Sequence, residues 1–186
     1  MGKKEKESQE GGYEMAKLRL AMKKALNPRR YEHTLGVAYM AAALAMRYGE
    51  DVKKAQAAGL LHDCAKNLSN EKRMKICHKN GIPISEAEHR NPFLLHAKVG
   101  SFLAKEKYGI QDQEILDAIA CHTTGKKDMQ TLDKILYVAD YIEARRDKAQ
   151  NLTAMRKLAF EDLDQALYQI MRGTLDYLTR KGSDLD

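Results

Sequence analysis

The strongest constraint on the fold is that the apolar residues recur at helical spacing, while no stretch of the sequence alternates as a strand does. Leu35, Ala38, Ala42 and Met46, for example, follow steps of three and four residues and would share one face of a helix. Three prolines, no tryptophan and abundant Ala, Leu, Lys, Glu and Met are typical of a mainly helical protein. The sequence therefore predicts an all-α protein.

The 186 residues suffice for one domain with a buried core. Residues 1–12 are charged and polar and end in two glycines, which predicts a disordered lead-in to a single domain over residues 13–182. Capping and stop signals predict helices over the ranges 13–26, 28–48, 51–63, 67–81, a short segment after Ser85, 92–108, 112–121, 131–145 and 152–178, the last being one helix or a broken pair. Asp51 and Ser69 are the expected caps of two of them, and Ser85 forms a capping box with Glu88.

Composition excludes several classes of protein. The net charge of +6 is spread along the chain, without the tight basic cluster of a nucleic-acid face. Cys64, Cys77 and Cys121 are too widely spaced, and odd in number, for a disulfide framework or a zinc–thiolate site. No apolar run has membrane length and no signal peptide is present, so we expect a soluble, cytoplasmic protein that binds neither membranes nor nucleic acids.

An apolar run from Ala57 to Leu61 leads directly into His62 and Asp63, near the end of an expected helix. An imidazole nitrogen and a carboxylate oxygen suit Fe, Mn or Zn and not a structural thiolate site. A His-Asp pair also arises by chance, and a histidine there is often a core or capping residue. Because neighbouring helical residues point about 100° apart, the two side chains need partners from other helices to enclose one ion.

Suitable partners stand on other expected helices, namely His33, His96, His122 and Asp140. Burying Asp140 without a partner would be costly, so a cation or strong hydrogen bonds should neutralise it. The alternative for Asp140 is an ion pair with Arg145 or Arg146 at the end of its own helix. Taken together, the set favours a metal site, whereas His78 and His89 lie in polar stretches and are predicted to be surface residues.

Five short motifs carry a family resemblance: Arg30-x-x-His33-Thr34, His62-Asp63-x-x-Lys66, His96-Ala97-x-Val99-Gly100, His122-Thr123-x-Gly125 and Ala139-Asp140-Tyr141-Ile142-Glu143. In this order they resemble the HD-domain metal-dependent phosphohydrolases, and more narrowly the YqeK-type subfamily, over residues 17–175. Members of that subfamily are symmetrical dinucleoside tetraphosphate hydrolases, which split diadenosine tetraphosphate into two ADP at an iron-containing site. The resemblance implies an HD-domain helical bundle with this activity.

The resemblance also implies residue roles. The metal ligands would be His33, His62, Asp63 and Asp140. The contacts to nucleotide phosphate would be Arg30, Lys66, His96, His122 and Arg146. The catalytic set would be Asp63, Lys66, His96 and His122. Two readings of His96 and His122 stay open: neutral ligands of a second ion, or imidazolium donors to a phosphate, able to protonate the leaving ADP. Thr123 and Thr124 could add hydroxyl donors.

The chemistry of the residues agrees with this expectation. Cleavage of a phosphoanhydride needs an activated water and positive charge at the phosphate oxygens. Lys66 lies one helical turn after Asp63, and Arg30 one turn before His33, so both can reach a phosphate bound at the metal. Either cation alone would be read as a solvated surface charge. Iron, with Mn or Co as alternatives, suits these ligands, as one ion or two.

Three functions follow, in order of preference. The first is a metal-dependent hydrolase that cleaves dinucleoside polyphosphates symmetrically to nucleoside diphosphates. The second is an HD-domain nucleotide phosphatase or phosphodiesterase with another nucleotide substrate. The third is a non-catalytic nucleotide-binding module. Nine methionines and an amphipathic C-terminal helix permit a homodimer without requiring one.

Overall fold

A computed structural model describes residues 14–182, so the lead-in predicted for residues 1–12 lies outside the described residues. Within residues 14–182 the chain forms helices and no strand, which confirms the all-α prediction. The helices are α1 (Met15–Ala25), α2 (Pro28–Tyr48), α3 (Val52–Leu61), α4 (Asn70–Asn80), α5 (Glu86–Arg90), α6 (His96–Glu106), α7 (Gln113–Cys121), α8 (Thr131–Ile142), α9 (Leu152–Glu161) and α10 (Leu163–Lys181).

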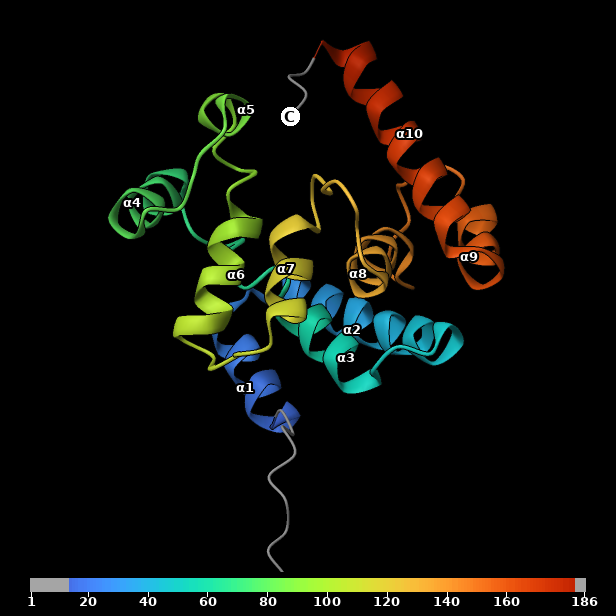
Figure 1. The fold of residues 1–186 in the computed structure, drawn as a ribbon, viewed down its shortest axis with the longest axis horizontal. Helices are drawn as coiled ribbons and strands as arrows, with labels where there is room; N and C mark the ends of the chain where they lie inside the picture. The colour runs from blue at the N-terminus through green and yellow to red at the C-terminus, as the bar shows by residue number, and fades with distance from the viewer. Residues whose placement is uncertain (1–13, 183–186) are drawn as a thin grey trace, which may run out of the picture.

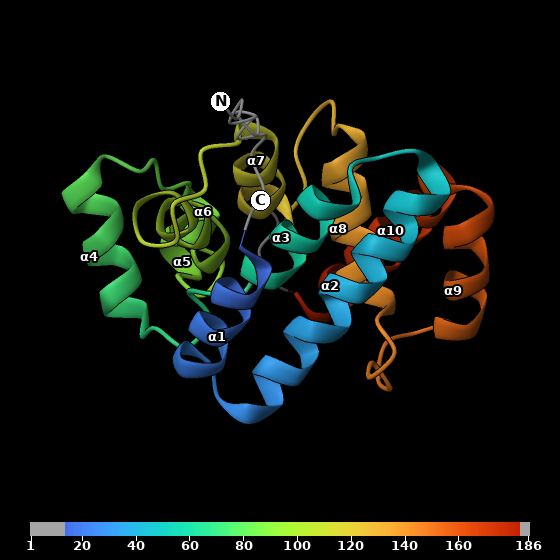
Figure 2. The same ribbon diagram turned by 90° about the horizontal axis from the view of Figure 1, so that it is seen from below.

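Helix α3 lies at the centre of the bundle. It packs against α1, α2, α7 and α8, and in Figure 2 it lies between α4 at one end of the molecule and α9 at the other. Its residues from Ala57 to Leu61 are all fully buried, because a helix enclosed on several sides must be apolar around most of its surface. The predicted site residues His62 and Asp63 directly follow this buried segment.

The helix ends match the capping signals in the sequence. Asp51 caps α3 by accepting hydrogen bonds from the backbone of Lys53 and Lys54. Ser69 caps α4, which ends at Gly81 in the left-handed conformation, and Ser85 forms the predicted capping box with Glu88. These local signals set the element boundaries around the site.

The structure corrects three expectations. The helix expected from residue 92 begins at His96, because residues 92–95 form a turn. The helix expected to reach residue 145 ends at Ile142. The stretch 152–178 is the broken pair that the sequence allowed, with Asp162 between α9 and α10. Of the face predicted for α2, Ala38 and Ala42 are buried but Met46 is 69% exposed, because the buried face is centred on Val37, Ala41 and Leu44.

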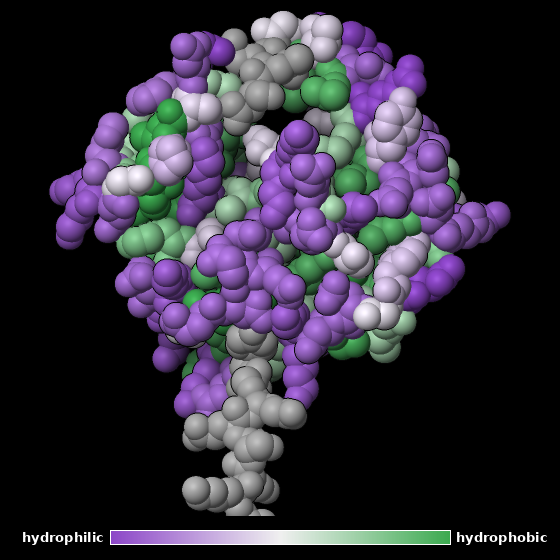
Figure 3. Space-filling model, in the orientation of Figure 1, coloured by the Kyte–Doolittle hydropathy of each residue, from purple (hydrophilic) through white to green (hydrophobic). Residues whose placement is uncertain are grey.

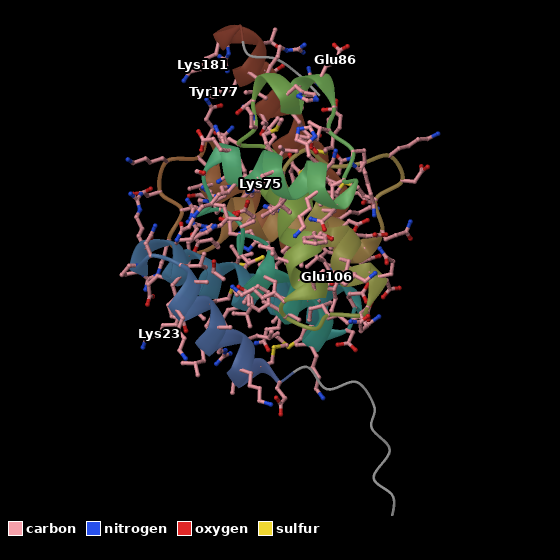
Figure 4. The ribbon with its side chains drawn as sticks, turned by 90° about the vertical axis from the view of Figure 1, so that its left-hand side faces the viewer. Lys23, Lys75, Glu86, Glu106, Tyr177 and Lys181 are labelled. Atoms are coloured by element: carbon pink, nitrogen blue, oxygen red, sulfur yellow. The ribbon has the colours of Figure 1, made fainter. Side chains whose placement is uncertain are left out.

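The start of α6 and the end of α7 lie at the same end of the bundle, as Figure 1 shows. Helix α4 covers the side of α6, and in Figure 4 it stands in front of α6, with Lys75 on α4 and Glu106 at the end of α6. The face drawn in Figure 3 is mostly hydrophilic, with smaller apolar patches between charged side chains. None of the helices within residues 14–182 is both long and apolar enough to span a membrane.

Candidate metal centre

The centre of the site is the turn that follows α3. His62 is the C-cap of α3, and its backbone N–H still donates to Ala58, while Lys66 N–H donates to the carbonyl of Asp63. The helical hydrogen bonding thus continues briefly as a tight turn that fixes both side chains. His62 is 0% exposed and Asp63 is 2% exposed, so an imidazole and a carboxylate are held inside the bundle.

Three histidines are oriented by the same local device. In each, the ring Nδ1 lies 2.7 Å from the carbonyl oxygen three residues earlier, and the pairs are His62 with Gly59, His96 with Phe93 and His122 with Ile119. A carbonyl only accepts, so Nδ1 carries the proton and donates it. Nε2 is then left with its lone pair facing the interior, which is how metal-ligating histidines are prepared.

The first group of converging atoms joins α2, the end of α3 and α8. His33 Nε2 lies 3.0 Å from Asp140 Oδ1, and His62 Nε2 lies 3.9 Å from the same oxygen. His62 Nε2 is also 3.6 Å from Asp63 Oδ2. One donor atom from each of His33, His62 and Asp63, and one from each of His62, His122 and Asp140, fall within 4.8 Å of one another. The four ligands that the resemblance implies therefore meet in space.

A second group of donor atoms converges around Oδ1 of Asp63. Asp63 Oδ1 lies 3.6 Å from His96 Nε2 and 3.6 Å from His122 Nε2, and these two nitrogens are 3.3 Å apart. The hydroxyl of Thr123 lies 3.0 Å from His96 Nε2. Asp63 thus stands between two nitrogen groups, with one oxygen facing each.

Basic side chains border both carboxylates. Arg30 donates to Asp63 Oδ2 at 2.6 Å, and Lys66 Nζ lies 3.3 Å from Asp63 Oδ1. Arg146 donates to Asp140 Oδ1 at 2.7 Å, so the ion pair considered as an alternative for Asp140 is formed alongside its contact with His33. Arg145 does not take part, because it pairs with Glu32.

Burial and charge set the protonation of the site. Burial lowers the pKa of His62 to about 4, and burial together with Lys66 lowers the pKa of His96 to about 2. Burial acts to raise the pKa of Asp63, but the neighbouring imidazoles and ammonium outweigh it and hold that pKa well below its ordinary value. For Lys66, burial lowers the pKa against the pull of Asp63. His62 and His96 are therefore neutral beside an ionised Asp63, the state in which these groups bind a cation.

Two buried polar atoms indicate what this site is built to hold. Within residues 14–182, His62 Nε2 and Asp63 Oδ1 are buried side-chain atoms that make no hydrogen bond. Leaving such atoms without hydrogen bonds costs free energy, and apart from the Lys66 ammonium near Asp63 Oδ1 they face other electron-pair donors. A divalent cation with nitrogen and oxygen ligands would satisfy them, so the residues present fit a metal ion.

Glu143 is a site residue that the sequence analysis missed. It is 1% exposed, and its Oε1 accepts the Nδ1–H of His33 at 3.0 Å, leaving His33 Nε2 to face Asp140. A Cβ atom at Gly36 would overlap Glu143 Oε2, so any other residue there would displace the Glu143 carboxylate from its present position. The available signal was spacing, because Glu143 follows Asp140 by three residues and so returns to the same side of the chain.

The remaining sequence predictions concern two further histidines and two threonines. His78 and His89 are exposed, as predicted. Thr123 lies against both second-group histidines, at 3.0 Å from His96 Nε2 and 3.2 Å from His122 Nε2, whereas exposed Thr124 hydrogen-bonds only locally, to Gly125. The geometry thus gathers all nine predicted site residues, while their individual roles in binding and catalysis stay predictions.

Comparison with known proteins identifies the family to which this chain belongs. The family model described as HD domain matches residues 30–145, a span that includes every histidine and carboxylate of the two groups. The chain belongs to the HD-domain family. The expected helical HD fold is therefore confirmed, and with it the resemblance carried by the five motifs.

More specific likeness comes from individual relatives. A protein of Bacillus subtilis (strain 168) named symmetrical bis(5'-nucleosyl)-tetraphosphatase is 43% identical over 160 residues, 86% of this chain and 85% of the relative. A protein of the same name from Halalkalibacterium halodurans is 34% identical, over 88% and 87% of the two chains. A crystal structure from Clostridium acetobutylicum, described as a predicted HD superfamily hydrolase involved in NAD metabolism, has a TM-score of 0.90 and 41% identity, with 95% and 93% coverage.

Proposed function

We propose that this protein is a metal-dependent hydrolase that cleaves diadenosine tetraphosphate symmetrically into two ADP. The observation that carries the proposal is the buried carboxylate of Asp63, which presents one oxygen to His62 and the other to His96 and His122. Relatives named for this activity are 34–43% identical over most of the chain, which supports the choice of substrate.

The metal ligands in this proposal are His33, His62, Asp63 and Asp140. When bound there, a divalent ion would act as a Lewis acid toward a phosphoryl oxygen and would lower the pKa of a coordinated water. We propose iron, with Mn or Co able to replace it, because imidazole and carboxylate donors suit all three. Asp140 is held for this role by His33 on one side and Arg146 on the other.

The phosphate chain would be bound by the cations around the carboxylates. Lys66 is placed to meet a phosphate oxygen as a point charge, while Arg30 and Arg146 can each offer several N–H donors in one plane. His96 and His122 complete the site as nitrogen donors, since the Nδ1 of each already donates to a carbonyl. Their shared approach to Asp63 Oδ1 favours a second ion over an imidazolium donor.

Location and assembly are part of the same proposal. A cytoplasmic location agrees with the three cysteines, which are all unpaired and buried. A homodimer stays a prediction from composition, and light scattering coupled to size-exclusion chromatography would measure it. The partners proposed are small molecules: a dinucleoside polyphosphate as substrate and a nucleoside diphosphate as product.

Product analysis tests the reaction. Protein purified anaerobically and supplied with Fe(II) or Mn(II) should convert diadenosine tetraphosphate to ADP alone, as resolved by ion-exchange chromatography. Formation of ATP and AMP would overturn symmetrical cleavage. Activity confined to other nucleotides, with release of inorganic phosphate, would favour a different HD-domain phosphatase.

Substitution of Asp63 separates an enzyme from a binding module. Asp63→Ala should reduce turnover by more than about 100-fold and lower metal content, because this carboxylate faces both groups of nitrogens. Circular dichroism should show the helical fold retained. An unfolded variant, together with a wild-type protein that is inactive with every metal, would instead support a purely structural role.

A further inference from the structure

An apolar ring is exposed at the border of this site. Phe93 is 44% exposed. It lies in the turn that precedes α6, where its carbonyl accepts the Nδ1–H of His96 at 2.7 Å. The two rings are 5.2 Å apart between centroids. Phe93 is thus fixed by its backbone to a site histidine while part of its ring surface faces solvent.

A buried arginine supports the ring. Arg73 on α4 is 3% exposed, and its guanidinium carbon lies 5.4 Å from the centroid of the Phe93 ring. Its N–H groups donate to Asn70 Oδ1 and to the Lys66 carbonyl, each at 2.7 Å. These bonds hold the Arg73 guanidinium beside the ring. Helix α4 is the helix marked by Lys75 in Figure 4, where it stands beside α6.

The same ring adjoins the proposed phosphate-binding cation. Lys66 Nζ lies 4.7 Å from the Phe93 centroid and 2.7 Å from His96 Nε2. A phosphate oxygen that binds Lys66 would therefore lie close to the exposed ring of Phe93. In a nucleotide the base is joined to the phosphates through the ribose, so a nucleotide whose phosphates bind Lys66 has its base near Phe93.

We propose that Phe93 is the platform on which a nucleobase of the substrate stacks, a role that rests on the proposed function. Arg73 and the carbonyl bond to His96 hold the ring in place, and the part of Phe93 that is exposed is the surface that would meet the planar base. Stacking on an apolar ring is tolerant of base identity, because every base has a π-face. The site should then accept adenine and guanine nucleotides alike.

A fluorescent substitution tests direct stacking. The chain contains no tryptophan, so Phe93→Trp introduces a single reporter at the platform. With Mn(II) present, ADP should quench its fluorescence, because a stacked base quenches indole, whereas pyrophosphate should not. In the control Tyr168→Trp, at an exposed position of α10, neither ligand should change the signal. ADP binding seen by calorimetry without quenching in Phe93→Trp would overturn the platform and leave the proposed function standing.

Kinetics of a second variant give an independent readout. Phe93→Ala should raise KM for diadenosine tetraphosphate by roughly 5- to 150-fold, the loss expected for one stacked base. Its inhibition constant for pyrophosphate should stay at the wild-type value, and Phe93→Tyr should retain most of the affinity. An equal loss for pyrophosphate would show that the ring acts only through Lys66 and would overturn the proposal. A wild-type protein that neither binds ADP nor hydrolyses the substrate would overturn both proposals.

Discussion

Side-chain orientation at the site is decided by single hydrogen bonds. His62, His96 and His122 each donate Nδ1–H to a carbonyl three residues earlier, so their orientation is local and follows from their position at a helix end or in a turn. His33 differs, because its Nδ1–H donates to Glu143, which is 110 residues away in the sequence. The orientation of this one ligand depends on tertiary structure.

Removal of Glu143 should therefore weaken metal binding through His33. Glu143→Ala is expected to lower metal affinity by about 10- to 100-fold, the usual effect of losing the carboxylate that orients a ligand histidine. Glu143→Gln keeps an acceptor oxygen and should lose less. Competition with a chromophoric chelator measures the affinity. Glu106→Ala, at an exposed carboxylate at the end of α6, is the matched control, and an equal loss in that variant would contradict the role of Glu143.

At the scale of elements, the position of α3 depends on a close approach to α2. Gly59 lies against the backbone of α2, where an added Cβ would come within 2.6 Å of the Ala38 Cα. Small residues on the facing side of α2, including Ala41 and Ala45, are fully buried. This contact sets the distance between the helix that carries His33 and the helix that leads to His62.

Gly59→Ala should destabilise the protein by about 1–3 kcal/mol, because backbone rather than a flexible side chain would have to move. Urea unfolding measures the free energy. Gly173→Ala is the matched control: it also lies within a helix, but its added Cβ would meet no atom within 4 Å among residues 14–182. That change should be neutral or stabilising by up to about 1 kcal/mol, as expected from helix propensity alone. Equal effects of the two changes would exclude a close helix contact as the cause.

At the scale of the whole molecule, the site joins distant parts of the chain. The proposed metal ligands come from α2, the turn after α3 and α8, so an ion bound there would connect three elements of the bundle. The second group adds the start of α6 and the turn after α7. A cation at this place would stabilise the folded state, because the unfolded chain has no such assembled site.

Metal removal should consequently lower thermal stability. A cation at 100 times its Kd stabilises the folded state by about 2.7 kcal/mol, which for a domain of this size corresponds to a Tm shift of roughly 5–10 °C. Thermal melts before and after dialysis against a chelator would measure the shift. Asp63→Ala should show a smaller difference between the two conditions. An unchanged Tm in a wild-type sample shown by elemental analysis to have lost its metal would contradict a bridging site.

The sequence by itself determined the helical class, most helix ends and the residues with site chemistry. Helical spacing and caps act over a few residues, so Asp51, Ser69 and Ser85 could be placed correctly without any knowledge of packing. The motif order brought the candidates together as a family resemblance, which the match over residues 30–145 then confirmed.

Only the tertiary structure decided how those candidates share space. Asp63 turns one oxygen toward His62 and the other toward His96 because α3 and α6 pack together. The bond from His33 to Glu143 and the exposure of Phe93 likewise depend on contacts between elements far apart in the chain. The spacing of apolar residues and their helix propensity predict which face of a helix is apolar, but they do not indicate which other helix packs against that face. For that reason the sequence could indicate which residues have metal-binding and phosphate-binding side chains, whereas the distances between those side chains depend on how the helices pack.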